Sequence, residues 1–373
     1  MTTSERPGLG DAAALVELPA DPAELHEVFA ERGWSDGLPV IPPTEERVEA
    51  MLAYSDRDRR EVLGVLPPRR GVATVEAVAI NAVLAGCEPR ALPVLLAAVQ
   101  GLVQPQFNLS GINATTHPCA VLVLVNGPIG RELGVNSGPG CYGPGFRANA
   151  TIGRAIRLLL LNVAGASPGH GDRATQGTPA KFALCIAENE EASPWPQFHT
   201  TRGFEPEHST VTVSASEGPH NIQEHGSNTA LGVLQTVAGA LGQAGSNNIL
   251  SRGEPMLALG PEHAETIADE GWTREGVQQY LYEHARYPAS RLSPEFLESV
   301  NVRIEPELGI DPFPPDALLP IVNEPEQLHL IVAGGPGKHS SWLPTFGQRT
   351  SPVTTVIADR NGRPLGSVED LRG

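Results

Sequence analysis

The chain has 373 residues, of which 43 are acidic and 26 basic, so its net charge is −17 at pH 7. This excess of negative charge argues against nucleic acids and anionic membrane surfaces as partners. The 40 glycines and 35 prolines fall below the level of a disordered low-complexity chain, and the 40% of hydrophobic residues suffice for a substantial core. We therefore expect a compact protein rich in irregular, well-packed loops.

Several features favour a soluble cytoplasmic protein. The first residues, Met1 to Asp11, are polar and lack the apolar stretch of a secretory signal. Apolar runs such as Val121–Val125 are too short to cross a bilayer. The four cysteines contain no CxxC pair, which argues against a disulfide framework or a cysteine zinc site. We expect no membrane partner, and a homo-oligomer stays open.

In chain order, the predicted elements alternate between helices and strands after a tail at 1–20. Apolar residues at helical spacing predict helices at Pro22–Arg32, Thr44–Leu52, Val72–Ala85, Ala91–Val103, Ala148–Asn162, Thr229–Leu241, Pro261–Asp269 and Thr273–Arg286. Short apolar runs, many rich in valine, predict strands at Cys119–Val125, Phe182–Ala187, Thr210–Ser214, Met256–Leu259, Leu328–Ala333 and Thr354–Ala358.

This alternation is typical of an α/β protein with a layered, mixed sheet and covering helices. We expect two closely packed subdomains with long loops rich in glycine and proline. The first is a helix-rich α/β domain at 21–205, and the second is an α/β domain at 206–373 that packs against it.

Charged residues are scarce between Arg90 and Arg147, where only Arg131 and Glu132 occur, although uncharged polar residues are frequent. Buried polar groups need partners, and a ligand can supply some of them. We therefore favour a pocket wall over purely structural polar packing, with Asn113 and Thr116 as candidate substrate-binding residues.

His117 and Cys119 lie two residues apart at the start of a predicted strand, so both side chains would point to the same face. A histidine beside a thiol can lower its pKa and form a nucleophile or a proton-transfer pair. Alternatively, Cys119 is a small buried hydrophobic residue and His117 a hydrogen-bonded polar one. We favour the chemical role for His117 and the structural one for Cys119, and keep both as catalytic candidates.

The loop that follows is rich in glycine, and Gly138–Gly143 formally matches GxGxxG. Its prolines and the lack of a strand before it argue against a dinucleotide site. Asn149 can cap the next helix, and Arg147 and Arg154 flank its beginning, which favours binding of an anion. The alternative is a capped helix with two solvated arginines.

Two further groups of polar residues follow predicted strands. Glu188 and Glu190 come after an apolar strand, where one could act as a general acid or base, although a solvated acidic loop is the usual explanation. His220, Asn221 and His225 follow another strand. The two histidines could bind a metal, transfer protons or be structural; they do not form HExxH. No cofactor is strongly indicated, and a divalent metal is possible.

Lys338 is one of two lysines and follows a glycine-rich turn, Gly334–Gly337, with His339 next to it. The spacing does not fit a P-loop, so we expect no nucleoside triphosphate. Lys338 and His339 are candidates for holding a small anion, and a surface turn is the competing interpretation.

Together, these segments resemble an uncharacterised family of bacterial proteins. The resemblance covers nearly the whole chain after residue 20 and is carried by Gly33–Pro43, Thr115–Cys119, Arg147–Arg154, Glu188–Trp195 and Gly334–Ser341. Members of this family are often encoded beside small proteins with a Cys-or-selenocysteine-Gly-Ser-Cys motif. The resemblance implies a two-component enzyme whose partner supplies a reactive thiol or selenol, and it brings no established catalytic residues.

We expect an enzyme, a lyase or an oxidoreductase subunit, that makes or breaks a carbon–heteroatom bond in a small anionic metabolite by acid/base chemistry. Arg147, Arg154 and Lys338 would bind the anion. His117 would transfer protons, with Glu188 or His220 opposite. The alternatives are a non-catalytic substrate-binding scaffold of a redox complex, and a metal-dependent lyase or hydrolase that uses His220 and His225.

Overall fold

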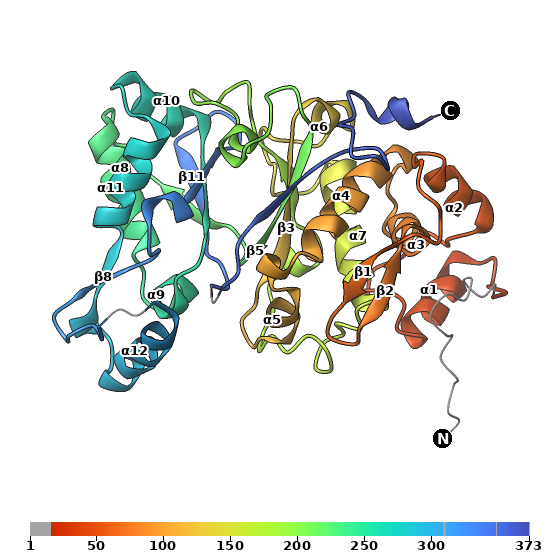
Figure 1. Cartoon of the computed structure of the whole chain (residues 1–373), viewed down its shortest axis with the longest axis horizontal. Coiled ribbons are helices and arrows are strands. Elements are labelled where there is room, and N and C mark those ends of the chain that lie inside the picture. Colours follow the sequence, from red (N-terminus) through yellow and green to blue (C-terminus); the bar gives the residue numbers. More distant parts are fainter. Residues whose placement is uncertain (1–15, 309–310, 348, 373) are drawn as a thin grey trace.

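Two four-stranded sheets form the centre of the computed structural model, which describes residues 16–308, 311–347 and 349–372 (Figure 1). The first sheet has the order β12-β5-β3-β4, made of Val353–Val356, Thr210–Ser216, Ala120–Asn126 and Cys185–Ala187. The second has the order β10-β7-β11-β6, made of His329–Val332, Met256–Leu259, His339–Leu343 and His220–Gln223. In each sheet one pair is parallel, β3 with β4 and β10 with β7, and the other pairs are antiparallel.

The sheets pack face to face between two layers of helices, so the molecule has four layers. Side chains alternate along β3, and this alternation divides the core. Leu122 and Leu124 share an apolar cluster with Met256 and Ala258 of β7, which lies between the sheets. Val123 and Val125, which point to the other face of β3, belong to a second cluster under the helices. The expected α/β class with mixed sheets and covering helices is confirmed.

The helices on the first sheet include α3 (Val75–Ala85), α4 (Leu92–Leu102) and α7 (Arg147–Asn162), on the right of Figure 1. Most of α4 is buried, as its nearly continuous apolar sequence predicts. Outside them lie α1 (Pro22–Glu31) and α2 (Glu45–Leu52). The side chain of Thr44 caps α2 as expected, by accepting a hydrogen bond from the amide of Arg47.

The beginning of α3 differs from the prediction because the residues before it form a strand. Gly71–Thr74 is β2, which pairs with β1 (Val62–Leu66) in a separate hairpin. Thr74 then caps α3 through its side chain, so the helix starts three residues later than the apolar pattern indicates. Two short helices on this side, α5 (Leu109–Ala114) and α6 (Pro128–Glu132), were not predicted.

The outer face of the second sheet is covered by α8 (Ala230–Leu241), α10 (Pro261–Asp269) and α11 (Arg274–His284), on the left of Figure 1. Below them lie α9 (Asn247–Ser251), α12 (Pro294–Leu308), β8 (Arg286–Pro288) and β9 (Leu318–Pro320). None of these four elements was predicted. Nor were β6 and β11, which the sequence pattern indicated as loops.

The predicted domain boundary at residue 205 does not coincide with the division of the strands between the two sheets. Both β5 and β12 follow that residue, yet they lie in the sheet of β3 and β4. The division into domains at 21–205 and 206–373 stays a prediction. Most of the predicted tail, residues 1–15, lies outside the described residues. In the described part of the chain, no helix combines the length and the apolar character that a membrane crossing needs.

Candidate active site

His117 and Glu217 form a hydrogen-bonded pair at one end of the first sheet. His117 lies just before β3, and Glu217 directly follows β5. These strands are antiparallel, and Ala120 pairs with Ser216, so the residues before β3 lie beside those after β5. The distance from His117 Nε2 to Glu217 Oε1 is 2.7 Å. The strand register therefore brings together two side chains that are 100 residues apart in sequence.

Backbone contacts and packing fix this pair. The amide of Glu217 donates to the carbonyl of Pro344 at 2.9 Å, and the amide of His117 donates to Thr115 Oγ1 at 3.0 Å. The ring of Phe346 packs against the imidazole, with 5.9 Å between the ring centroids. The His117 side chain is 10% exposed and that of Glu217 is 28% exposed. Glu217 is thus the more accessible partner, and His117 lies behind it.

Glu217 lines a cavity of about 530 Å³ that lies between the starts of β3 and β4 and the connection from β5 to β6. Tyr142 and Thr178 also line this cavity. The hydroxyl of Tyr142 is buried and has no hydrogen-bond partner among the described residues. Burial also raises the pKa of Tyr142, so its hydroxyl stays protonated.

This arrangement suits proton transfer. With Nε2–H of His117 donating to one carboxylate oxygen, Glu217 keeps lone pairs that can accept a proton from a molecule in the cavity. Thr178 lies on the same cavity wall. A carboxylate held by an imidazole can act as a general base and, once it is protonated, as a general acid.

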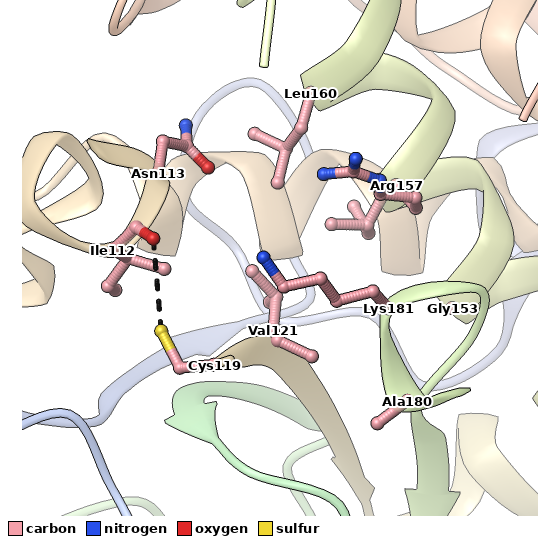
Figure 2. A pocket seen from close by; sticks show the side chains of 11 residues that line it. Ile112, Asn113, Cys119, Val121, Gly153, Arg157, Leu160, Ala180 and Lys181 are labelled. Carbon is pink, nitrogen blue, oxygen red and sulfur yellow. Dashed lines mark hydrogen bonds between the residues drawn. The ribbon is translucent and has the colours of Figure 1, made fainter. Parts of the chain in front are cut away.

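Cys119 is buried in the apolar cluster under the helices, as the structural role favoured for it requires. Figure 2 shows the Cys119 sulfur pointing toward Ile112 of α5, whose carbonyl oxygen is 3.9 Å from it. Burial raises the pKa of Cys119 to about 12, so the thiol is protonated at neutral pH. The cavity beside it has only about 20 Å³, room for a single water. Asn113 lines the same small cavity and donates to the carbonyl of Pro67 at 2.8 Å.

The polar side chains at the start of α7 hold the fold together, contrary to our expectation of an anion site. Arg154 donates to both carboxylate oxygens of Asp36 at 2.8 Å and so anchors the segment 33–43. Arg147 donates to the carbonyl of Gly86. Asn149 is buried and bonds both the amide and the carbonyl of Asn136. Thr116 is exposed, and its carbonyl accepts from the amide of Thr175.

Lys338 and His339 lie at the beginning of β11, and Pro344 follows the other end of this strand. Lys338 donates to the carbonyl of Ser227 and to Asn228 Oδ1, both at 2.8 Å. His339 is hydrogen-bonded to Asn221 Oδ1 at 2.9 Å and lies 3.1 Å from His225, measured between the Nε2 atoms. These contacts join neighbouring chain segments around Lys338 instead of leaving it directed at an anion.

His220 and His225 do not lie close together. In the sheet register His220 pairs with Trp342, at the opposite end of β6 from His225. Five residues of extended chain separate the two histidines by roughly 16 Å. Among the described residues, no group of three or more His, Cys, Asp or Glu side chains is placed to hold a metal ion.

Glu188 and His117 lie at opposite ends of β3. The prediction that Glu188 faces His117 across a substrate is therefore wrong. The seven residues of β3 span roughly 23 Å. Glu188 is buried, and its Oε2 accepts from Asn126 Nδ2 at 2.5 Å and from the amide of Phe198 at 2.7 Å. Its Oε1 lies 4.0 Å from Arg274 of α11. Burial raises the pKa of Glu188 to about 7.

Sequence reasoning missed Glu217 as the partner of His117. It also missed Tyr142 and Thr178. The signal that could have found Glu217 is the pairing of two valine-rich strands, one that begins just after His117 and one that ends just before Glu217. If these strands are antiparallel neighbours, their flanking residues meet.

Comparison of the chain with known protein families, curated proteins and solved structures finds no match. The functional argument therefore rests on the site itself.

Proposed function

We propose that this protein is an enzyme that uses Glu217, held by His117, as a general acid or base on a small molecule in the adjoining cavity. The single observation that carries the proposal is the 2.7 Å hydrogen bond between these residues at the wall of a cavity of about 530 Å³. A cavity of this size suits a metabolite. A carboxylate on the wall of such a cavity is a group that proton transfer requires.

The cavity favours a neutral or cationic substrate over the anion that the sequence suggested. None of the eleven described residues that line it is Lys or Arg, and Glu217 contributes a carboxylate. The arginines and the lysine expected to bind an anion are engaged with protein groups elsewhere. An amine or an uncharged polar metabolite fits this wall better.

The reaction that we propose is cleavage or formation of a carbon–heteroatom bond. In the cleavage direction, Glu217 takes a proton from the carbon next to the bond that breaks. The electron pair of that C–H bond forms a double bond, and the heteroatom leaves with the electrons of its bond to carbon. Glu217 then gives its proton to the departing heteroatom, which restores the carboxylate.

A second candidate function is a substrate-binding subunit that needs a partner for thiol or selenol chemistry. The observation that favours it is the burial of Cys87, Cys119, Cys141 and Cys185, whose pKa values are all raised by desolvation. A reactive thiolate would then have to come from another protein. Four unpaired cysteines also suit a reducing compartment, so we propose the cytoplasm.

One experiment tests the proposal and separates the two candidates. The purified chain is screened against small amines and neutral polar metabolites, with and without a dithiol or selenol partner. Product formed by the chain alone, and lost in Glu217→Gln but not in the exposed Glu207→Gln, supports the enzyme. Product formed only with the partner, and unaffected by Glu217→Gln, supports the binding subunit instead.

A further inference from the structure

A second cavity, which shares no residue with the first, lies beside the start of β7 and is lined by three arginines. Its volume is about 170 Å³, and all ten lining residues are polar, charged or glycine. The arginines come from three separate segments: Arg252 follows α9, Arg303 lies on α12 and Arg349 precedes β12. The fold thus brings three arginines to one cavity in a chain whose net charge is −17.

The three arginines differ in exposure in a way that suits a ligand. Arg252 is buried, with its guanidinium carbon 5.6 Å from the ring centroid of Phe313. Arg303 and Arg349 are exposed, which places them at the mouth. Arg252 and Arg349 both have positive φ angles, 40° and 63°, in a region that glycine adopts more easily. Arginine at these two positions works against the local backbone preference, as side chains with a function often do.

Glu254 is the one carboxylate among the described residues that line the cavity. That carboxylate is engaged by His329, 3.0 Å from its Oε2, and by the hydroxyl of Ser351, 2.5 Å from its Oε1. The guanidinium groups of Arg303 and Arg349 are exposed, and guanidinium groups bind phosphate and carboxylate oxygens in pairs. Neighbouring hydroxyl and amide side chains, such as Thr350 and Asn323, can complete the coordination.

We infer that this cavity binds a small oxyanion, either a free ion or the phosphate, sulfate or carboxylate group of a metabolite. Water occupies about 30 Å³ per molecule in the liquid, so the cavity holds several waters that an ion of four or five heavy atoms would displace. These arginines are not the ones that the sequence suggested for binding an anion. The inference does not depend on the function proposed for Glu217.

Isothermal titration of the full chain with inorganic phosphate, sulfate and acetate, at constant ionic strength, tests this inference. We expect saturable binding of at least one of these ions at one site per chain. Arg303→Gln and Arg349→Gln should each weaken it at least tenfold. Arg60→Gln, an exposed arginine between α2 and β1, should leave it unchanged, as should Glu217→Gln. A preference for phosphate and sulfate would indicate a tetrahedral group, and a preference for acetate would indicate a carboxylate.

Two results would overturn the inference. One is the absence of saturable binding with a Kd below about 1 mM for all three ions. The other is binding that Arg303→Gln and Arg349→Gln leave unchanged. Arg303 is exposed on a helix and its backbone is not at positive φ, so Arg303→Gln alone decides the matter if Arg349→Gln does not fold.

Discussion

Glu217 Oε1 lies 2.7 Å from His117 Nε2, and only the carboxylate of this pair lines the large cavity. The histidine therefore acts through the glutamate. Phe346 packs on the imidazole and the amide of Glu217 is tied to Pro344, so the pair is held from two sides. Because Glu217 lines the cavity and His117 positions it, we expect substitutions at the two residues to have different effects.

His117→Ala should lower kcat about 10- to 100-fold and leave KM nearly unchanged, because the charge-assisted hydrogen bond that orients Glu217 is lost. His117→Gln should recover part of the loss, because its amide N–H can also donate to the carboxylate. Steady-state kinetics of both variants check this expectation. Equal loss in both variants, or a loss confined to KM, would contradict the positioning role.

Glu188 should make stability depend on pH. Burial raises its pKa from 4.5 to about 7, so the folded state binds more protons than the unfolded state between these values. The free energy of unfolding therefore falls as pH rises through this range, by roughly 3 kcal/mol. Glu188→Gln has no group that titrates there and should lack this fall.

The measurement for Glu188 is urea unfolding between pH 4.5 and 8. The difference between the wild type and Glu188→Gln isolates this group, because the buried histidines, whose pKa values are lowered, contribute equally to both. Glu191→Gln, on an exposed neighbour, should follow the wild type. Identical slopes for all three proteins would show that Glu188 is ionised throughout.

Arg154 should be essential for stability, although it does not bind a ligand in this account. Burial raises the pKa of Asp36, but the hydrogen bonds and charge of Arg154 outweigh it and hold the pKa below its usual value. Arg154→Gln leaves this carboxylate buried without its partner and should cost about 3–5 kcal/mol. Arg147→Gln, at a side chain that is 60% exposed, should cost less than about 1 kcal/mol.

Chemical denaturation of the two arginine variants checks this prediction. Adding Asp36→Asn to Arg154→Gln should restore part of the lost stability, because the unpaired charge is removed. Comparable losses in Arg147→Gln and Arg154→Gln would mean that the bridge to Asp36 contributes little.

The cysteines should resist alkylation in the native protein. Burial raises the pKa of Cys87 and Cys119 to about 12 and that of Cys141 to about 11, and it also raises that of Cys185. A shift of three units reduces the thiolate about 1,000-fold at pH 8. Mass spectrometry after iodoacetamide treatment should find labels only in urea. Rapid labelling of native Cys119 would revive the nucleophile hypothesis.

How far the sequence predicts the fold depends on the length and regularity of each segment. α7 and β3 are found with nearly correct bounds because α7 repeats apolar residues at helical spacing and β3 is a continuous apolar run. β11, His339–Leu343, is missed because it begins with polar residues after a glycine-rich turn. It becomes a strand through pairing with β6 and β7, which no local pattern encodes.

The candidate site is less predictable because it depends on strand register and long-range contacts. His117 is singled out correctly for its position before an apolar strand, but its partner depends on which strand lies beside it. The sequence around Arg154 suggests that this residue binds an anion. In the structure its guanidinium group instead donates to Asp36, which is 118 residues away. The arginines of the smaller cavity come from positions 252, 303 and 349, and only the tertiary fold brings them together.

The most direct test of the proposed function is the kcat/KM of Glu217→Gln for the substrate that the screen identifies. Glutamine keeps the size of the side chain but cannot accept the proton, so we predict a loss of at least about 100-fold, with Glu207→Gln unchanged. A kcat/KM for Glu217→Gln within a factor of about two of the wild type would mean that catalysis takes place elsewhere.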